Sequence, residues 1–339
     1  MSQILPKKNL KQLFSNWAAG YEIYAPQQLE KFAHFMPTNG SELLYIDEQH
    51  NTRFPPKALF LPQSETLMKY TRFGAAQETI PESKPRIVFG IRPCDAKAVD
   101  LLNLMFLTEK DSDPYYQARR KKTALIGIGC NIPCPSCFCT TVESGPFGRQ
   151  GMDALLTDLE DIYLVRTLSQ TGKTLFAEYP EATEAQEAEA KAVQQRSLKL
   201  IDPAFETKGL KAKLDSNFEN ALWQKFADSC LGCGICTFLC PTCFCFDIAD
   251  EAQRKERVRN WDTCMFRTYS LEASQHNPRP TRRERTRQRV MHKFSYWLDH
   301  VNKIGCTGCG RCVRYCPVGL DIRAMLREFN QLEAEVANG

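Results

Sequence analysis

The stretch Cys306-Thr-Gly-Cys309-Gly-Arg-Cys312-Val-Arg-Tyr-Cys316-Pro317 holds four cysteines at the spacing Cys-x2-Cys-x2-Cys-x3-Cys and ends in proline. An earlier stretch, Cys230-Leu-Gly-Cys233-Gly-Ile-Cys236-Thr-Phe-Leu-Cys240-Pro241, has the same spacing and the same closing proline. We call the earlier stretch the first cysteine run and the later one the second. Because the whole pattern recurs, it indicates one structural unit that the chain uses twice.

This spacing is typical of bacterial ferredoxins that bind two cubic iron–sulfur clusters. Three thiolates of one run bind one cluster, and the fourth thiolate, turned away by the proline, binds the other cluster. Paired cysteines also occur in zinc knuckles and disulfide scaffolds, but those sites do not need two complete runs closed by Cys-Pro. The sequence therefore predicts two [4Fe–4S] clusters. Cluster 1 is assigned to Cys230, Cys233, Cys236 and Cys316, and cluster 2 to Cys306, Cys309, Cys312 and Cys240.

The composition narrows the class of protein. The chain has 339 residues, a net charge of +4 and sixteen cysteines. Its N-terminal residues lack the apolar core of a signal peptide, and no apolar window reaches the ~18 residues that a membrane span needs. We therefore expect a cytoplasmic protein in a reducing compartment, where thiols remain able to bind metal. Oxygen-sensitive clusters further suggest an anaerobic setting.

Alternating strand and helix patterns precede the cysteine runs. Residues 86–91 and 123–129 are apolar enough for buried strands, and a helix between them is expected to begin with Asp95 as its N-cap. This order predicts an α/β domain with some parallel strand pairing. We also expect a helix at 27–35, strands at 43–46 and 58–61, and helix, strand and strand over 153–176.

The predicted organisation is mixed α+β and α/β. Residues 1–200 form the α/β domain, residues 201–216 a linker, and residues 217–339 a helical two-cluster ferredoxin-like domain. An insertion over 246–303 separates the two cysteine runs within that second domain.

Eight further cysteines lie outside the predicted ferredoxin set: Cys94, Cys130, Cys134, Cys137, Cys139, Cys243, Cys245 and Cys264. Cys94 and Cys130 follow predicted parallel strands, where the loops of an α/β sheet converge and build sites. The first five cysteines therefore predict a third cluster, although a buried cysteine can also be a small apolar residue. Cys134-Pro-Ser-Cys137-Phe-Cys139 resembles Cys240-Pro-Thr-Cys243-Phe-Cys245. Whether Cys243, Cys245 and Cys264 are ligands or buried thiols stays open.

Several motifs together carry a family resemblance. They are Phe-Gly-Ile-Arg-Pro-Cys94-Asp, the block from Cys130 to Cys139 with Gly145-Pro146, Cys240-Pro-Thr-Cys243-Phe-Cys245, Trp261-Asp-Thr-Cys264, His276-Asn-Pro-Arg-Pro280 and Cys316-Pro-Val-Gly-Leu-Asp321. The chain resembles the iron–sulfur β subunit of cytoplasmic NAD(P)-linked sulfhydrogenases. It is also similar to the A subunit of anaerobic sulfite reductase and to the iron–sulfur subunit of flavin oxidoreductases that feed heterodisulfide reductase. The resemblance extends over residues from about 20 to 330.

The resemblance implies a non-catalytic electron-transfer subunit of a multi-subunit oxidoreductase. Such a subunit relays electrons between a flavin subunit that handles NAD(P)H and a catalytic redox subunit. It also implies that Cys94, Cys130, Cys137 and Cys139 bind the third cluster and leaves Cys134 without an assigned role. The chain has no G-x-G-x-x-G after a strand and no Walker loop, so flavin and NAD(P) are expected on a partner.

A free-standing polyferredoxin is the alternative function, although such a carrier would not need about 200 residues of α/β domain. Another alternative is an enzyme whose clusters act directly, through an incompletely ligated cluster in the first domain. The arginines at 279, 282, 283, 285, 287 and 289 form a solvated helix face, a docking site for an acidic partner, or a set of counter-charges for the clusters. A nucleic-acid partner is not expected, because the rest of the chain has no basic stripe.

Overall fold

A computed structural model of the chain describes residues 2–30, 32–40, 51–71, 74–82 and 84–333. The chain forms two compact units. Unit 1 comprises residues 1–60, 80–202 and 307–309, and unit 2 comprises residues 61–79, 203–306 and 310–339. A single boundary near residue 200 does not describe this division. Residues 61–79 precede that boundary but belong to unit 2, and residues 307–309 follow it but belong to unit 1.

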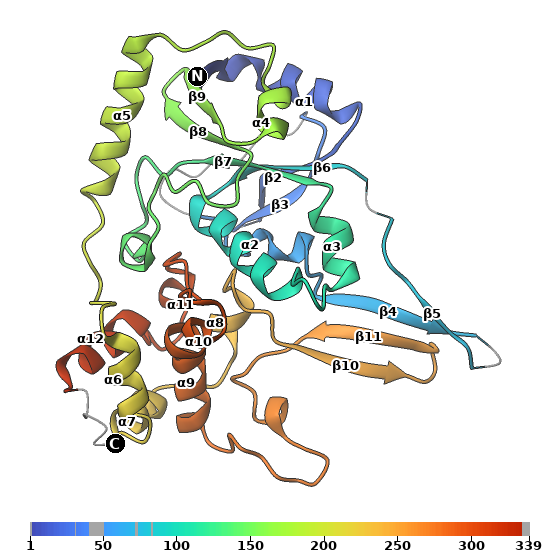
Figure 1. The fold of residues 1–339 in the computed structure, drawn as a ribbon, viewed down its shortest axis with the longest axis vertical. Coiled ribbons are helices and arrows are strands. Elements are labelled where there is room, and N and C mark those ends of the chain that lie inside the picture. Colours follow the sequence, from blue (N-terminus) through green and yellow to red (C-terminus); the bar gives the residue numbers. More distant parts are fainter. Residues whose placement is uncertain (1, 31, 41–50, 72–73, 83, 334–339) are drawn as a thin grey trace. The chain divides into compact units, whose positions relative to one another are not determined.

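Unit 1 is built on a mixed sheet of seven strands (Figure 1). Its spatial order is β1 (Ser2–Pro6), β9 (Ile162–Thr167), β8 (Ala154–Leu159), β7 (Thr123–Ile128), β6 (Arg86–Ile91), β2 (Glu22–Leu29) and β3 (Phe32–Thr38). The four central strands pair in parallel and the outer strands pair antiparallel. Strands β6 and β7 are almost completely buried, as expected for central parallel strands.

Helices cover the sheet of unit 1 on both faces. Its helical elements are η1 (Lys7–Asn9), α1 (Leu10–Ala18), η2 (Pro56–Leu59), α2 (Pro93–Phe106), α3 (Pro114–Arg120), η3 (Cys139–Val142), α4 (Gln170–Leu175) and α5 (Glu184–Leu198). Leu13, Phe14 and Trp17 of α1 pack into one core with Tyr163 of β9. Leu164, the next residue of β9, packs in a separate core with α5. Because neighbouring strand residues point to opposite faces, α1 and α5 cover opposite sides.

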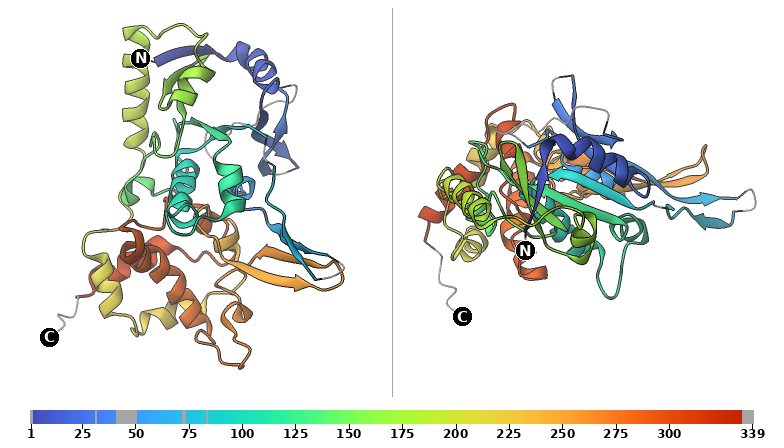
Figure 2. Two further views of the ribbon diagram at one scale, coloured as in Figure 1. Left: turned by 45° about the vertical axis from the view of Figure 1, so that its right-hand side comes forward. Right: turned by 90° about the horizontal axis from the view of Figure 1, so that it is seen from above.

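Unit 2 surrounds the cysteine runs with short helices: α6 (Leu210–Ser216), α7 (Leu222–Asp228), α8 (Ile235–Phe238), η4 (Arg267–Ser270), α9 (Arg282–Met291), α10 (Trp297–Val301), α11 (Arg311–Arg314) and α12 (Ile322–Gln331). A π-helical turn, η5 (His292–Tyr296), joins α9 to α10. A second sheet has the order β10 (Phe246–Glu251), β11 (Glu256–Trp261), β4 (Ser64–Tyr70) and β5 (Ala76–Glu78) (Figure 2). The buried ion pair between Arg259 and Glu65 ties β11 to β4.

The mixed fold class and the parallel pairing of the strands at 86–91 and 123–129 are confirmed. The predicted linker at 201–216 instead contains helix α6. The insertion at 246–303 consists of the β10–β11 hairpin and the long helical stretch from α9 through α10.

Four local predictions are wrong. Residues 27–35 form the β2–β3 hairpin rather than a helix, with Glu30 turning the chain at a φ of 52°. Residues 58–61 are not a strand, because Pro56–Leu59 is a short helix. Residues 153–176 form two strands and then a helix. Helix α2 begins at Pro93 with Arg92 as its N-cap, so Asp95 lies in the first turn. The strand predicted at 43–46 lies outside the described residues.

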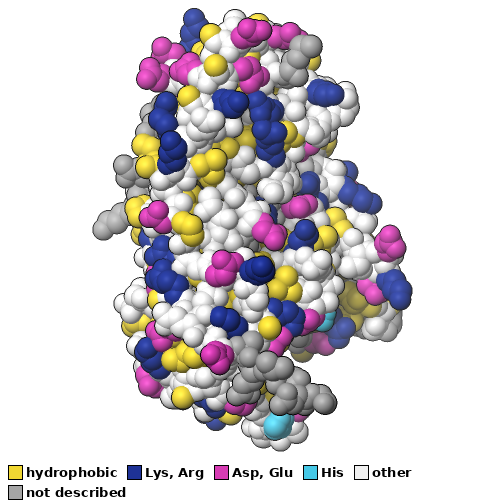
Figure 3. Space-filling model, turned by 60° about the vertical axis from the view of Figure 1, so that its left-hand side comes forward, with side chains coloured by type: hydrophobic (Ala, Val, Ile, Leu, Met, Phe, Trp, Pro, Cys, Tyr) yellow, Lys and Arg dark blue, Asp and Glu magenta, His cyan; other side chains and the backbone are white. Residues whose placement is uncertain are grey.

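Acidic and basic side chains are interspersed over the face that Figure 3 presents, with small apolar areas between them. Among the helices in the described part of the chain, none is both long and apolar enough to cross a membrane.

Candidate metal centres

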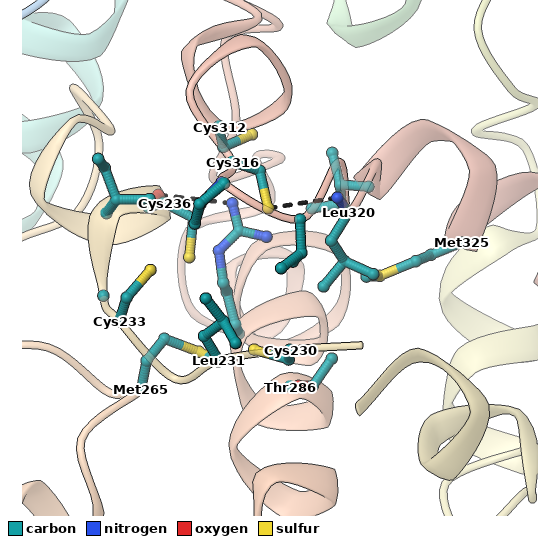
Figure 4. Close-up of a pocket in the computed structure, with 16 residues that line it drawn as sticks. Cys230, Leu231, Cys233, Cys236, Met265, Thr286, Cys312, Cys316, Leu320 and Met325 are labelled. Carbon is teal, nitrogen blue, oxygen red and sulfur yellow. Dashed lines mark hydrogen bonds between the residues drawn. The ribbon is translucent and has the colours of Figure 1, made fainter. Parts of the chain in front are cut away.

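One cavity of unit 2 is lined by cysteines from both runs (Figure 4). Cys230, Cys233 and Cys236 come from the first run, and Cys316 comes from the second. Their sulfur atoms point toward a common space, which is the arrangement that the crossed ligation of cluster 1 requires. Cys312, which the spacing assigns to cluster 2, lines the same cavity.

The two runs fold locally in the same way. Gly234 precedes the one-turn helix α8 with a φ of 75°, and Gly310 precedes the one-turn helix α11 with a φ of 73°. At Gly234 a Cβ atom would lie 2.7 Å from the Thr263 side chain. Glycine is therefore required there both by the left-handed backbone and by the close approach of the neighbouring segment.

The cavity lined by Cys230, Cys233, Cys236 and Cys316 offers a suitable environment for metal-bound sulfur. The backbone N–H of Gly232 donates to the Cys230 sulfur at 3.3 Å, and that of Leu320 donates to the Cys316 sulfur at 3.2 Å. Apolar side chains fill much of the remaining wall, among them Met265 and Met325. Hydrogen bonds to sulfur and limited solvent exposure are the two features by which proteins tune cluster potentials.

Two buried cations on consecutive turns lie beside the thiols of unit 2. Arg289, in α9, reaches the Cys236 carbonyl at 3.5 Å. Burial alone lowers the pKa of Arg289, but the surrounding Cys236, Cys312, Cys243 and Cys240 thiolates outweigh it and raise that pKa. The neighbouring thiolates therefore stabilise the charged form of Arg289. This agrees with the interpretation of this arginine as a counter-charge.

Lys293 is the second buried cation, and it contacts Cys240 directly. Its ammonium nitrogen lies 3.3 Å from the Cys240 sulfur, 2.9 Å from Thr242 Oγ1 and 3.1 Å from the Gly305 carbonyl. Burial again lowers its pKa, and the thiolates of Cys240, Cys243 and Cys306 raise it above its ordinary value. Lys293 thus lies between Cys240 and the start of the second run.

Three other arginines of the basic stretch have defined partners. Arg282 donates to the Cys230 carbonyl at 2.7 Å. Arg287 stacks on Phe218 at 3.7 Å and pairs with Glu219 at 2.7 Å. Arg285 is buried and donates to the carbonyl of Pro280. A uniformly solvated face is therefore the wrong interpretation of this helix.

In unit 1, the structure brings together the five cysteines that follow β6 and β7. Cys137 interacts with Cys134, Cys94 and Cys130, and Cys139 interacts with Cys130 and Cys134. Burial raises the pKa of Cys130, and Arg92 partly opposes this effect. For Cys139, burial and the neighbouring thiols raise the pKa to about 12. Neighbouring buried thiols disfavour one another's deprotonated, negatively charged form. A bound metal ion compensates that negative charge, so the thiolates can then lie side by side.

These cysteines lie close together because they follow the carboxyl ends of neighbouring parallel strands. Cys94 lies in the first turn of α2 directly after β6, and Cys130 follows β7. The buried ammonium of Lys97, on α2, donates to the carbonyls of Val142 and Glu143 and holds the end of η3 in place. Cys134 lies hydrogen-bonded to Cys137, so the cysteine without an assigned role is also part of the group.

The segment 307–309 of the second run packs within unit 1 beside these thiols. The Cys309 carbonyl accepts from the Cys137 thiol at 3.7 Å and from Asn51 Nδ2 at 3.0 Å. Phe138 donates its backbone N–H to the Gly308 carbonyl at 2.8 Å, and a Cβ on Gly308 would lie 2.5 Å from the Cys139 nitrogen. A cluster 2 cysteine thus adjoins a cysteine assigned to the third cluster.

Cys243, Cys245 and Cys264 line another cavity of unit 2 with His292 and Lys293. The sequence does not decide the role of these three cysteines, and its motifs do not point to Lys293 or Asn51. Lys293 could have been found from its place four residues after Arg289 on the same helical stretch. For Asn51 the sequence offers no comparable pattern, because its contact with Cys94 depends on the tertiary fold.

Comparisons with known proteins agree with the cysteine geometry. Residues 229–320 match the family model described as a 4Fe-4S dicluster domain, which implies two [4Fe–4S] clusters. The chain is 32% identical over 316 residues to sulfhydrogenase 2 subunit beta of Pyrococcus furiosus, covering 91% of this chain and 92% of that protein. No solved structure gives a significant match. By this identity and coverage, the chain belongs to the family of iron–sulfur β subunits of sulfhydrogenases.

Proposed function

We propose that this chain relays single electrons between a flavin subunit that oxidises or reduces NAD(P)(H) and a catalytic redox subunit of one complex. The catalytic subunit would be of the hydrogenase, sulfite reductase or heterodisulfide reductase type. The observation that carries this proposal is the cavity in which Cys316 of the second run joins Cys230, Cys233 and Cys236 of the first. The name of the Pyrococcus relative, a subunit of a sulfhydrogenase, supports a role within a hetero-oligomer.

A bound [4Fe–4S] cluster supplies one-electron reduction and oxidation without releasing a product. The residues around each cluster would set its reduction potential. Backbone N–H groups of Gly232 and Leu320 stabilise added negative charge on the sulfurs. Arg289 and Lys293 place positive charge beside the thiols, and apolar neighbours such as Met265 limit water.

The proposal includes a third [4Fe–4S] cluster in unit 1, bound by Cys94, Cys130, Cys137 and Cys139. Their mutual contacts support it, as does the placement of Cys94 and Cys130 after parallel strands. The contact between Cys137 and the Cys309 carbonyl supports electron passage between this cluster and cluster 2. Flavin and NAD(P) belong to the partner in this proposal.

Anaerobic affinity purification from the native host, with a cofactor inventory of the purified material, tests the proposal. Flavin with nickel and iron would identify a hydrogenase complex, and flavin with siroheme a sulfite reductase. Flavin with neither would identify another flavin-linked relay. A chain that purifies alone with about eight irons, as two clusters require, would contradict the subunit function and favour a free-standing polyferredoxin.

A further inference from the structure

A cavity of about 330 Å³ in unit 2 is lined by three cysteines that neither ferredoxin cluster uses: Cys243, Cys245 and Cys264. Its volume far exceeds the ~10–15 Å³ that one water molecule requires. The lining also includes Tyr269 and His292, together with the cationic side chains of Arg279, Arg289 and Lys293. This cavity is thus a polar, cationic space with thiols on its wall.

The β10–β11 hairpin is what brings two of these thiols together. Cys245 immediately precedes β10, and Cys264 follows the end of β11 by three residues. Phe246 is paired with Trp261 at the base of the hairpin, and the Asp262 N–H donates to the Cys245 carbonyl at 2.9 Å. The antiparallel register therefore fixes Cys245 and Cys264 at the two feet of one hairpin.

Neighbouring segments hold the third thiol and the hairpin feet in place. Thr263, which is completely buried, is hydrogen-bonded to Thr237 of the first run and accepts from the Met265 N–H at 3.1 Å. Cys243 donates its N–H to the Cys240 carbonyl at 3.4 Å. In unit 1, Cys137 makes the same turn with Cys134 at 2.9 Å, so the repeated Cys-Pro-x-Cys-Phe-Cys sequence folds alike in both units.

The environment differs from that of a cysteine buried for its apolar character. The side chains of Cys243, Cys245 and Cys264 are only partly buried. Cys245 and Cys264 are hydrogen-bonded to each other, and Cys243 is hydrogen-bonded to Cys240 of the first run. Arg289 and Lys293 line the same cavity, so positive charge stands beside the three thiols.

The size of the cavity bears on whether a single ion or a cluster would be bound. Over the described residues, no three His, Cys, Asp or Glu side chains converge closely enough to hold one metal ion. Zinc, for example, needs its sulfur ligands at about 2.3 Å from a common centre. A cluster places its irons at separate corners, so its ligands approach from the walls of a larger space.

We propose that Cys243, Cys245 and Cys264 bind a [4Fe–4S] cluster of their own, with His292 as the fourth ligand. His292 lies in the same lining, and its ring is positioned by Phe244 and Trp297 at centroid distances of 6.1 and 6.4 Å. It begins the π-helical turn η5, a distortion that is frequent at functional sites. The inference rests on the chain being an iron–sulfur subunit, but not on its proposed partners.

Iron analysis of the anaerobically purified full chain tests the proposal. Cys243→Ala, Cys245→Ala and Cys264→Ala should each remove about four irons per chain, since each disrupts the same cluster. The double variant Cys243→Ala/Cys264→Ala should lose no more iron than either single variant. By contrast, Cys264→Ala combined with Cys233→Ala of cluster 1, or with Cys240→Ala of cluster 2, should remove about eight irons.

The pattern of losses separates this inference from the proposed function. If Cys233→Ala removes iron while the three variants do not, the extra cluster does not exist and the relay remains. If neither group of variants removes iron, the iron–sulfur function itself fails. If Cys240→Ala/Cys264→Ala removes only about four irons, the thiols share one cluster and the separation proposed here is wrong.

A measurement on the unmodified chain covers the case in which the alanine variants fold poorly. Selective ¹⁵N labelling of histidine followed by pulsed EPR of the reduced protein should show a histidine nitrogen coupled to one cluster. The coupling should disappear in His292→Ala and persist in the control His276→Ala, whose side chain lies at an exposed position. Absence of any coupling in the unmodified chain would overturn the assignment of His292.

Discussion

At the scale of single residues, the placement of Lys293 has a direct redox consequence. Its ammonium lies 3.3 Å from the sulfur of Cys240 in a buried site, where charge interactions are poorly screened. A nearby positive charge stabilises the reduced form of a cluster, because reduction adds negative charge. Lys293 should therefore raise the potential of the cluster that Cys240 binds.

Replacing Lys293 with Met should lower the reduction potential of that cluster. We expect a decrease on the order of 60 mV or more, the equivalent of a tenfold change in a one-electron equilibrium. EPR-monitored redox titration measures it. Lys303→Met is the matched control, because Lys303 is exposed and the change in charge is the same. Equal potentials in the two variants would contradict the role of Lys293.

A second prediction at this scale concerns cluster 1, whose proposed ligands come from both cysteine runs. Cys316→Ala should eliminate the EPR signal of the cluster held by Cys230, Cys233 and Cys236, although Cys316 belongs to the other run. Cys306→Ala serves as the comparison, since it should affect cluster 2. The ligation scheme is wrong if Cys316→Ala leaves cluster 1 intact and removes the cluster of residues 306–312.

At the scale of secondary-structure elements, α12 depends on an N-cap that follows the second run. Asp321 accepts from the Arg323 N–H at 2.8 Å. Partial burial would raise the pKa of Asp321, but hydrogen bonds from Arg323 outweigh it and hold that pKa below its ordinary value. The charged carboxylate at the helix N-terminus also interacts favourably with the helix dipole.

Asp321→Ala should lower the free energy of unfolding by about 0.5–2 kcal/mol, the usual cost of losing an N-cap. Asp321→Asn should lose less, because asparagine also caps helices well. Anaerobic urea denaturation at neutral pH measures both values, with the exposed Asp202→Ala as control. Similar losses for Asp321→Ala and Asp202→Ala would show that the cap contributes little.

Local patterns predicted some elements and not others for physical reasons. The buried strands β6 and β7 follow from apolar runs, which are local features. Residues 27–35 form the β2–β3 hairpin instead of the predicted helix because β2 pairs with both β3 and β6, and the pairing with β6 is not a local feature. The β10–β11–β4 sheet joins residues far apart in sequence, so no local pattern could reveal it.

The groupings of cysteines at the candidate metal centres were predictable to different degrees for similar reasons. The ferredoxin spacing is itself local and specifies which thiols of cluster 1 meet. The gathering of Cys94 and Cys130 followed from strand ends, a general rule of α/β folds. The proximity of Cys245 to Cys264 depends on the register of a hairpin, which the local sequence does not reveal. The contact of Lys293 with Cys240 depends on the packing of α9 and η5 against the first run.

At the scale of the whole molecule, the proposed division of labour among subunits is testable with the isolated chain. The purified, cluster-loaded chain should not oxidise NADH or NADPH with a dye as acceptor, because flavin and dinucleotide binding are assigned to a partner. Adding the flavin subunit should restore dye reduction through the chain. Turnover by the chain alone would contradict the relay function.

The assignment of residues 307–309 to unit 1 bears on how the protein is synthesised. A ribosome releases the chain from its N-terminus, so most of unit 1 emerges before unit 2. Yet the backbone that packs against Phe138 and Cys139 is synthesised long after those two residues. Co-translational folding of unit 1 therefore remains incomplete until the second cysteine run has left the ribosome. Insertion of the proposed third cluster at the thiols around Cys137 would then follow the synthesis of the second cysteine run rather than accompany the first domain.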